Sequence, residues 1–400
     1  MENLPFLLLA GLMLSSFFAV SYASQKLRLP SVLAYIVLGA GVSVVFLENE
    51  FIFVAAEIGI VLLFFILGLE FPLARMMTIS KRIWPAGLLD IGLNLGGAMA
   101  VSLLFGLDIV SAFTIGSVAY ATSSSISAKM LEEKKRLANP EAEFILALLI
   151  FEDLVAPILV SFIAGFRSGE EVSALFMGIL FLKIIVLAAG AVLMGHYGFR
   201  RMKNFIAKYI ENDFMPLLAV GLALGYAGLA IVLGLSEILG AFLAGVMLSE
   251  TGRSTEIERL LLPIRDLSLP FFFFWFGTSL NFGEGIPFVG MMIVLVLLAV
   301  GGKIVTAYAG SRLFGLSEKA SSRAAFSMVQ RGEFSAIIAS LALPQLRIFS
   351  GVYILITAFI GVYLFGRAPD IANWHHTKWV QPKKGMASKK EAEARNPAEQ

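Results

Sequence analysis

Apolar segments of about 20 residues follow one another along most of this chain, separated by short stretches that contain charged residues, proline or glycine. A helix of that length spans the hydrocarbon core of a bilayer. Hydrophobic residues make up 58% of the chain and charged residues only 15%, against about 25% charged residues in a typical soluble protein. The sequence therefore predicts an all-α integral membrane protein.

Division of the chain at these breaks predicts thirteen transmembrane helices. They span residues 4–24, 30–47, 51–69, 83–105, 109–130, 142–165, 172–198, 213–232, 235–249, 269–281, 287–312, 321–342 and 346–366. The first segment lacks the basic stretch and the cleavage site of a secretory signal, so we expect it to be retained.

Basic residues favour one side of this topology. The predicted inner loops contain most of them, for example Lys134, Lys135 and Arg136, whereas the outer loops contain only Arg167 and Arg347. By the positive-inside rule, the N-terminus lies outside and the C-terminus in the cytoplasm of a cell inner or plasma membrane. This distribution satisfies topology and does not indicate nucleic-acid binding.

Metal and cofactor chemistry has little support in the composition. The chain has no cysteine, which excludes disulfides and thiolate metal sites, and its three histidines form no metal-binding pattern. We expect no cofactor, no metal beyond a transported alkali cation, and no enzymatic activity.

Two short motifs occur twice in the same order. Residues 29–39 (LPSVLAYIVLG) align with residues 235–245 (LSEILGAFLAG), and residues 64–68 (FFILG) align with residues 273–277 (FFWFG). The matched spans lie seven apart, an odd number, so the two halves enter the membrane in opposite directions. Such inverted repeats are typical of alternating-access transporters. We predict repeat one at about 1–166, a linker helix at about 172–198 and repeat two at about 213–366.

Polar residues interrupt one span in each repeat. The fifth span contains Thr122, Ser123, Ser124 and Ser125, whose hydroxyls can bond backbone groups freed by an unwound turn. The twelfth contains a second interruption, formed by Gln330, Arg331, Gly332 and Glu333. We therefore predict two crossed discontinuous helices, although a serine-rich packing seam would also explain the fifth span.

An acidic pair lies inside the sixth span. Glu152 and Asp153 stand within the apolar run 144–162, where an ionised carboxylate costs about 3 kcal/mol. Adjacent side chains point about 100° apart on a helix, so only one can face a given site. Pro157 cannot donate a hydrogen bond to the Asp153 carbonyl. We predict that Asp153 binds an alkali cation with the hydroxyls of Thr122, Ser123 and Ser124, and that Glu152 faces a neighbouring helix. A buried pair with only a packing role is the alternative.

Lys303 is a second intramembrane charge, and Gly301 and Gly302 before it permit close helix approach. We expect Lys303 to pair with Asp153. Lys183 in the linker is a rival, and we interpret it as structural, paired with Glu57 or Asp90.

Asp90 and Asn94 stand one helical turn apart on the fourth span. They either line the inner access path or bond neighbouring helices.

These residues together resemble the monovalent cation:proton antiporters of the second large branch, which share a cation/H⁺ exchanger transmembrane domain. The resemblance covers 29–366 and includes the acidic pair, the serine-rich break, Lys303 and the motif Gly332 to Phe334. It implies a homodimer in which spans four to six and eleven to thirteen form a mobile core and the other spans form a scaffold.

Residues 138–143 (ANPEAE) and the motif Phe151 to Asp153 look most like the two-component K⁺ or NH₄⁺/H⁺ antiporters, whose nucleotide-sensing regulatory subunit is a separate chain. Residues 367–400 contain no Gly-x-Gly-x-x-Gly and are expected to form a partly disordered cytoplasmic tail.

We therefore predict a secondary active antiporter in which K⁺, or Na⁺, competes with H⁺ for Asp153. A ligand-gated cation efflux channel and an organic-anion symporter with a related broken-helix fold are the alternatives. The sequence leaves the choice among K⁺, Na⁺ and NH₄⁺ and the stoichiometry open.

Overall fold

The computed structural model describes residues 5–26, 31–43, 50–70, 83–166, 174–201, 214–280 and 285–375. Every regular element in these ranges is helical, which confirms the all-α prediction. In the described part, nine helices are long and apolar enough to cross a membrane, and three apolar helices are shorter. The count of thirteen spans stays a prediction.

The helices follow the predicted segments in order. In repeat one they are α1 (Phe6–Lys26), α2 (Ser31–Gly41), α4 (Glu50–Leu69), the helix Ile83–Leu104 with its π-helical turn η1 (Ile91–Gly96) and its last part α6 (Gly97–Leu104), α7 (Ile109–Tyr120), α8 (Ser124–Glu133) and α9 (Pro140–Phe166). The predicted linker is α10 (Ala174–Leu193), which continues into the π-helical turn η2 (Met194–Phe199).

In repeat two the helices are α12 (Met215–Val232), α13 (Glu237–Ser249), α14 (Ser254–Thr278), α15 (Val289–Leu313), α16 (Glu318–Ala325), α17 (Glu333–Ser340) and α18 (Pro344–His375). Two predicted boundaries are wrong. Helix α14 begins at Ser254, well before the predicted 269, and α18 continues past 366 to His375. The rest of the predicted tail lies outside the described residues.

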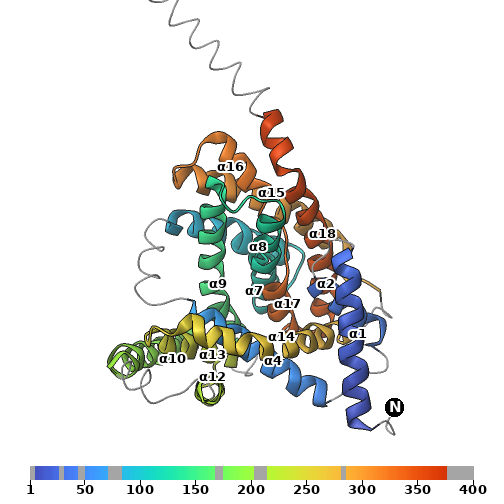
Figure 1. Cartoon of the computed structure of the whole chain (residues 1–400). Helices are drawn as coiled ribbons and strands as arrows, with labels where there is room; N and C mark the ends of the chain where they lie inside the picture. The colour runs from blue at the N-terminus through green and yellow to red at the C-terminus, as the bar shows by residue number, and fades with distance from the viewer. Residues whose placement is uncertain are drawn as a thin grey trace, which may run out of the picture.

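The helices form two groups (Figure 1). Helices α4, α10, α12, α13 and α14 lie together along the lower part of the view, and α7, α8, α9, α15 and α16 lie above them. Within the lower group, α4 packs against both α13 and α14, and α14 also packs against α2. The upper group holds both interrupted helices, α7 with α8 and α16 with α17.

Glycine pairs hold the lower group together and reveal its symmetry. A Cβ added at Gly39 of α2 would overlap the backbone of α14 near Gly277, and one at Gly68 of α4 would overlap α13 near Gly245. Backbones approach this closely only through residues without side chains. The sequence repeat relates α2 to α13 and α4 to α14, so each glycine contact is the image of the other. The inverted repeat is therefore visible as a pair of equivalent helix crossings.

Candidate functional site

The first interruption lies between α7 and α8. Helix α7 ends at Tyr120, Ala121 adopts an extended conformation, and α8 begins at Ser124. The backbone N–H of Thr122 donates to Oε2 of Glu152 at 2.6 Å, and the N–H of Ser123 donates to the carbonyl of Gln330 at 2.9 Å. Backbone groups that the break exposes are thus satisfied by other helices, as an interruption at membrane depth requires.

The second interruption crosses the first. Gly332, which precedes α17, packs so tightly on Ser123 that a Cβ there would come within 2.5 Å of the serine Oγ. The hydroxyl of Ser335 donates to the carbonyls of Val118 and Ala121 at the end of α7, at 2.8 and 3.0 Å. Gln330 Nε2 donates to Ser127 Oγ at 2.6 Å. These contacts confirm the predicted crossing of two discontinuous helices.

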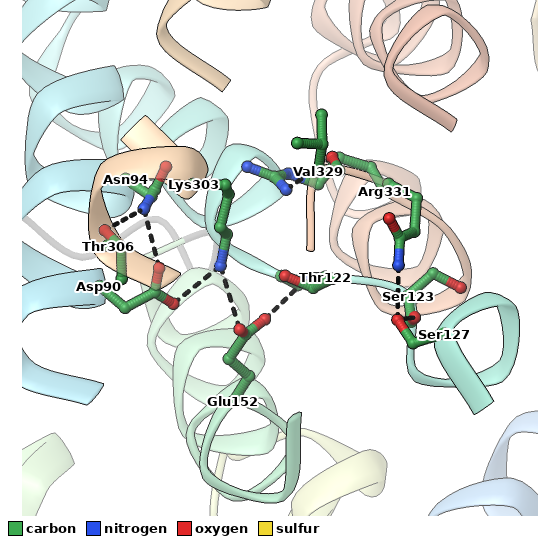
Figure 2. A network of polar contacts seen from close by, with 12 residues as sticks. Asp90, Asn94, Thr122, Ser123, Ser127, Glu152, Lys303, Thr306, Val329 and Arg331 are labelled. Atoms are coloured by element: carbon green, nitrogen blue, oxygen red, sulfur yellow. Dashed lines mark hydrogen bonds and ion pairs between the residues drawn. The ribbon is translucent and has the colours of Figure 1, made fainter. Parts of the chain in front are cut away.

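Lys303 lies beside this crossing, between two carboxylates (Figure 2). Its Nζ is 2.8 Å from Asp90 Oδ2 and 3.0 Å from Glu152 Oε1, and all three side chains are at most 1% exposed. We call Asp90, Glu152 and Lys303 the lysine cluster. The ring of Tyr120 adds a cation–π contact, with its centroid 5.3 Å from Nζ. One ammonium thus serves two carboxylates, which leaves one formal negative charge in excess.

The expected pair of Lys303 with Asp153 is therefore wrong. The two acidic side chains diverge, as neighbours on a helix must, and Glu152 is the one that faces α15. Lys183 does not pair with Asp90 either, because Asp90 is bonded to Lys303 and Asn94. The Nζ of Lys183 instead lies near Gly234, in the turn that joins α12 to α13.

Asp90 and Asn94 both bond to the neighbouring helix α15, as one of the two predictions for this pair expects. Asn94 Nδ2 donates to Asp90 Oδ1 at 2.8 Å and to Thr306 Oγ1 of α15 at 3.2 Å. Asn94 is 2% exposed and Asp90 is completely buried. Gly302 is required here, since a Cβ at that position would lie 2.6 Å from Asn94 Oδ1.

Asp153 occupies a different environment. It is 4% exposed, it interacts with the Ser124 hydroxyl and with the charge of Glu333, and its Oδ1 has no hydrogen-bond partner in the described structure. Glu333 accepts hydrogen bonds from Ser123 Oγ at 2.6 Å and Ser124 Oγ at 3.2 Å. The hydroxyl of Thr122 is likewise buried without a partner. Carboxylate and hydroxyl oxygens of this kind suit a hard monovalent cation.

Arg331 is the largest fully buried side chain among the described residues. Its Nη1 donates to the carbonyl of Val329 at 3.1 Å, and the guanidinium also interacts with the Tyr353 hydroxyl. Its charge acts on Asp90. The side chain of Ser125 is outside what the structure describes, so its predicted role has no structural test.

A cavity of about 400 Å³ separates α8 from the helices of the lower group. Its walls include Lys129 of α8, Tyr35 of α2 and Asp266 of α14. In the described part of the chain, no group of three or more His, Cys, Asp or Glu side chains could hold a metal ion. The cavity thus adjoins α8, which begins at the first break, but Glu152 and Asp153 are not among the residues that line it.

Comparison with known sequences identifies the family. A profile described as "Sodium/hydrogen exchanger, transmembrane" matches residues 12–367. The chain belongs to this family. Exchangers of this family are transporters, which agrees with the position of Asp90, Glu152 and Asp153 in helices long and apolar enough to cross a membrane.

Individual relatives extend over most of the chain. The ammonium/H⁺ antiporter subunit AmhT of Alkalihalophilus pseudofirmus is 48% identical over 94% of this chain and 96% of its own length. The K⁺/H⁺ antiporter subunit KhtU of Bacillus subtilis is 31% identical over 78% of each chain. The structure of the sodium proton antiporter MjNhaP1 from Methanocaldococcus jannaschii superimposes with a TM-score of 0.63 at 17% identity, covering 91% of this chain and 96% of that one. This exchanger therefore has the sodium/proton antiporter fold.

Sequence reasoning missed two groups of contacts. Thr306 stands one turn after Lys303, and Tyr120 directly precedes the first break, so their positions beside known site residues were available signals. Arg136, Glu141 and Arg323 form a second buried cluster, which we call the arginine cluster. Nothing in hydropathy separates these arginines from ordinary residues of cytoplasmic loops.

Proposed function

We propose that this protein is a secondary active antiporter that exchanges a monovalent cation for protons at Asp153. The observation that carries the proposal is the division of labour within the acidic pair. Glu152 is engaged by Lys303 and the Thr122 N–H, while Asp153 keeps a buried, unpartnered Oδ1 at the crossing of the broken helices. A carboxylate with one unpartnered oxygen in that position can bind either a proton or a cation.

Competition for one carboxylate gives the coupling. Asp153 is neutral with a proton bound and neutral with a monovalent cation bound, and it is charged only when empty. A charge in a low-dielectric path opposes movement of the core through the membrane, so the core moves when Asp153 is neutralised.

K⁺ and NH₄⁺ are the proposed cations, with Na⁺ as the alternative. The support comes from the relatives, since AmhT is named for ammonium and KhtU for potassium. Transport assays with K⁺, NH₄⁺, Rb⁺, Na⁺ and Li⁺ in vesicles containing a pH-sensitive dye would rank them. A response to Na⁺ and Li⁺ alone would contradict this choice.

Asp153→Asn tests the site. We expect the variant to be produced at normal levels and to lose cation-dependent dissipation of a pH gradient in everted vesicles, because the amide cannot take part in charge exchange. The matched control is Glu57→Gln, which removes an exposed carboxylate of α4. Full exchange by Asp153→Asn would rule out Asp153 as the exchange site, and cation flux that ignores the proton gradient would identify a channel.

The larger organisation is also proposed. Residues 1–366 would form the exchanger domain of a homodimer, with a mobile core, a scaffold, an outer N-terminus and a cytoplasmic tail. Both AmhT and KhtU are named as subunits, which supports a separate regulatory chain on the cytoplasmic side. Co-purification of the exchanger with a small cytoplasmic protein that binds nucleotide would test this assembly.

A further inference from the structure

Lys303 contacts two carboxylates, although one would balance the charge of its ammonium. Asp90 on the helix Ile83–Leu104 and Glu152 on α9 approach Nζ to 2.8 and 3.0 Å, from two different helices. Tyr120 of α7 covers Nζ with its ring, and the charge of Arg331 also acts on Asp90. In the described structure these four groups face the ammonium or its carboxylate partners, and Asp153 also acts electrostatically on Glu152 and Tyr120.

The two carboxylates are held in different ways. Asp90 is fixed in place, because Asn94 donates to its Oδ1 and also to Thr306 of α15, the helix that carries Lys303. Asp90, Asn94 and Lys303 thus form one network between two uninterrupted spans. Glu152 instead bonds through Oε2 to the Thr122 N–H, which lies in the break between α7 and α8. In the described structure, Glu152 hydrogen-bonds both the ammonium and the break between α7 and α8 (Figure 2).

We propose that Asp90 is a permanent counter-ion of Lys303 that keeps the ammonium protonated when Glu152 changes partner, so that the exchanger moves one proton for each monovalent cation. The inference deepens the proposed function and rests on it.

The physical argument concerns what happens when Glu152 moves. A buried ammonium with no carboxylate tends to release its proton, because burial disfavours the charged form. If Glu152 were the sole partner of Lys303, its departure on cation binding would release a second proton from the lysine. Asp90 at 2.8 Å prevents that release. The cation then displaces only the proton on Asp153, and the charges of the bound proton and the bound cation are equal.

The thermodynamic balance of the wild-type exchanger tests this directly. In proteoliposomes at zero membrane potential, a tenfold K⁺ gradient should sustain a pH difference of about one unit when one proton exchanges for one cation, and about half a unit when two protons do. NH₄⁺ is avoided as the probe because NH₃ crosses the bilayer. We expect about one unit, unchanged when a membrane potential is imposed. A value of half a unit, or one that follows the potential, would overturn the proposal while leaving antiport intact.

Asp90→Asn provides the second arm. The amide keeps the size of the side chain and one acceptor oxygen but removes its charge, so Lys303 would have Glu152 as its only carboxylate partner in the lysine cluster. We expect the sustained pH difference to fall towards half a unit and to become sensitive to potential, whereas Glu57→Gln stays at one unit. An active Asp90→Asn variant that still sustains one unit would contradict the role of Asp90. If wild-type protein supports no exchange with any cation of the series, the proposed function itself fails.

Discussion

The lysine cluster is fully buried and the arginine cluster partly so, and both join the two repeats, but their charge ratios are opposite. In the lysine cluster, one ammonium faces two carboxylates, Asp90 and Glu152. In the arginine cluster, one carboxylate faces two guanidinium groups. Glu141 Oε1 is 3.3 Å from Arg136 Nε, and Glu141 Oε2 is 2.9 Å from Arg323 Nη2.

The arginine cluster has a structural role, because it connects helices of the two repeats. Arg136, in the loop between α8 and α9, also donates to Ser327 Oγ at 3.0 Å and to the Phe365 carbonyl at 3.3 Å, and it stacks on the Phe365 ring. These bonds tie the first repeat to the end of α16 and to α18. Burial lowers the pKa of Arg136, and the nearby charge of Glu141 opposes that shift. A guanidinium nevertheless remains protonated throughout the physiological range.

The difference between the clusters teaches what each can do. A surplus of guanidinium groups cannot exchange protons, so the arginine cluster provides fixed charge and geometry. A surplus carboxylate can accept a proton, so the lysine cluster can change its charge during a transport cycle. The position of each agrees with this division, since the lysine cluster adjoins the crossing of the broken helices and the arginine cluster lies at the end of α9 away from it.

Of the changes considered for the two clusters, Lys303→Ala should have the largest effect. The change leaves Asp90 and Glu152 facing each other without a cation, and removal of one partner from a buried ion pair costs about 3–5 kcal/mol. We expect loss of exchange and a lower melting temperature in detergent. The loss of stability should grow as the pH rises, because a proton can replace the ammonium only at low pH. A wild-type melting temperature at pH 8 would show that Lys303 is not required by its two carboxylates.

Glu141→Gln makes the corresponding change in the arginine cluster, because it removes the charge that the two guanidinium groups share. The two arginines would then repel each other, but Arg323 is 22% exposed, so the cost should be about 2 kcal/mol, less than for a fully buried pair. We expect a lower melting temperature and an unchanged pH profile of the remaining exchange. Asp370→Asn, in an exposed pair with Arg367, is the control and should change neither quantity. A shifted pH profile in Glu141→Gln would show that the arginine cluster takes part in proton exchange.

Asp108 gives a reference carboxylate outside both clusters, with the smallest expected effect. It caps α7 by accepting hydrogen bonds from the N–H groups of Val110 and Ser111, both at 3.0 Å. Burial tends to raise the pKa of Asp108, but hydrogen bonds from Ser111 and Val110 outweigh it and hold the pKa below the usual 3.8. Stability from the ionised cap is therefore present above the unfolded-state pKa and is lost as the pH falls through the lower folded-state pKa.

Asp108→Ala should accordingly cost about 1 kcal/mol at neutral pH, with a smaller difference from wild type in strong acid. Thermal unfolding at several pH values measures it. Asp108→Asn retains a capping oxygen and should remain close to wild type at neutral pH. An equal loss in both variants would mean that the charge, and not the cap, stabilises α7.

Much of the fold could be predicted because insertion into a membrane requires features that are visible within each local segment of the sequence. The spans were marked by the length of each apolar run. The two breaks were marked by the hydroxyl residues Thr122 to Ser124 and by Gly332. The paired motifs at Gly39 and Gly245 predicted an inverted repeat before any contact was known. The start of α14 at Ser254 escaped because its first turns carry charged residues, which local hydropathy assigns to a loop.

The site was predicted only in part, for a geometric reason. The acidic pair and Lys303 were recognised as intramembrane charges, but their partners depend on how α9, α15 and the helix Ile83–Leu104 are rotated against one another. Neighbours on a helix differ by about 100° in direction, so a modest rotation exchanges Glu152 for Asp153 as the residue that faces Lys303. The hydropathy of the sequence gives no information about that rotation.

The sequence by itself determined the membrane class, the two interrupted helices and the presence of costly charges at membrane depth, because each follows from the transfer of one segment out of water. Only the tertiary structure decided that Lys303 takes Asp90 and Glu152, that Asp153 keeps an unpartnered oxygen, and that Arg136 and Arg323 share Glu141. The pairs of Lys303 with Asp90 and Glu152, and of Arg323 with Glu141, join residues more than 100 positions apart, and they depend on helix packing, which no single segment encodes.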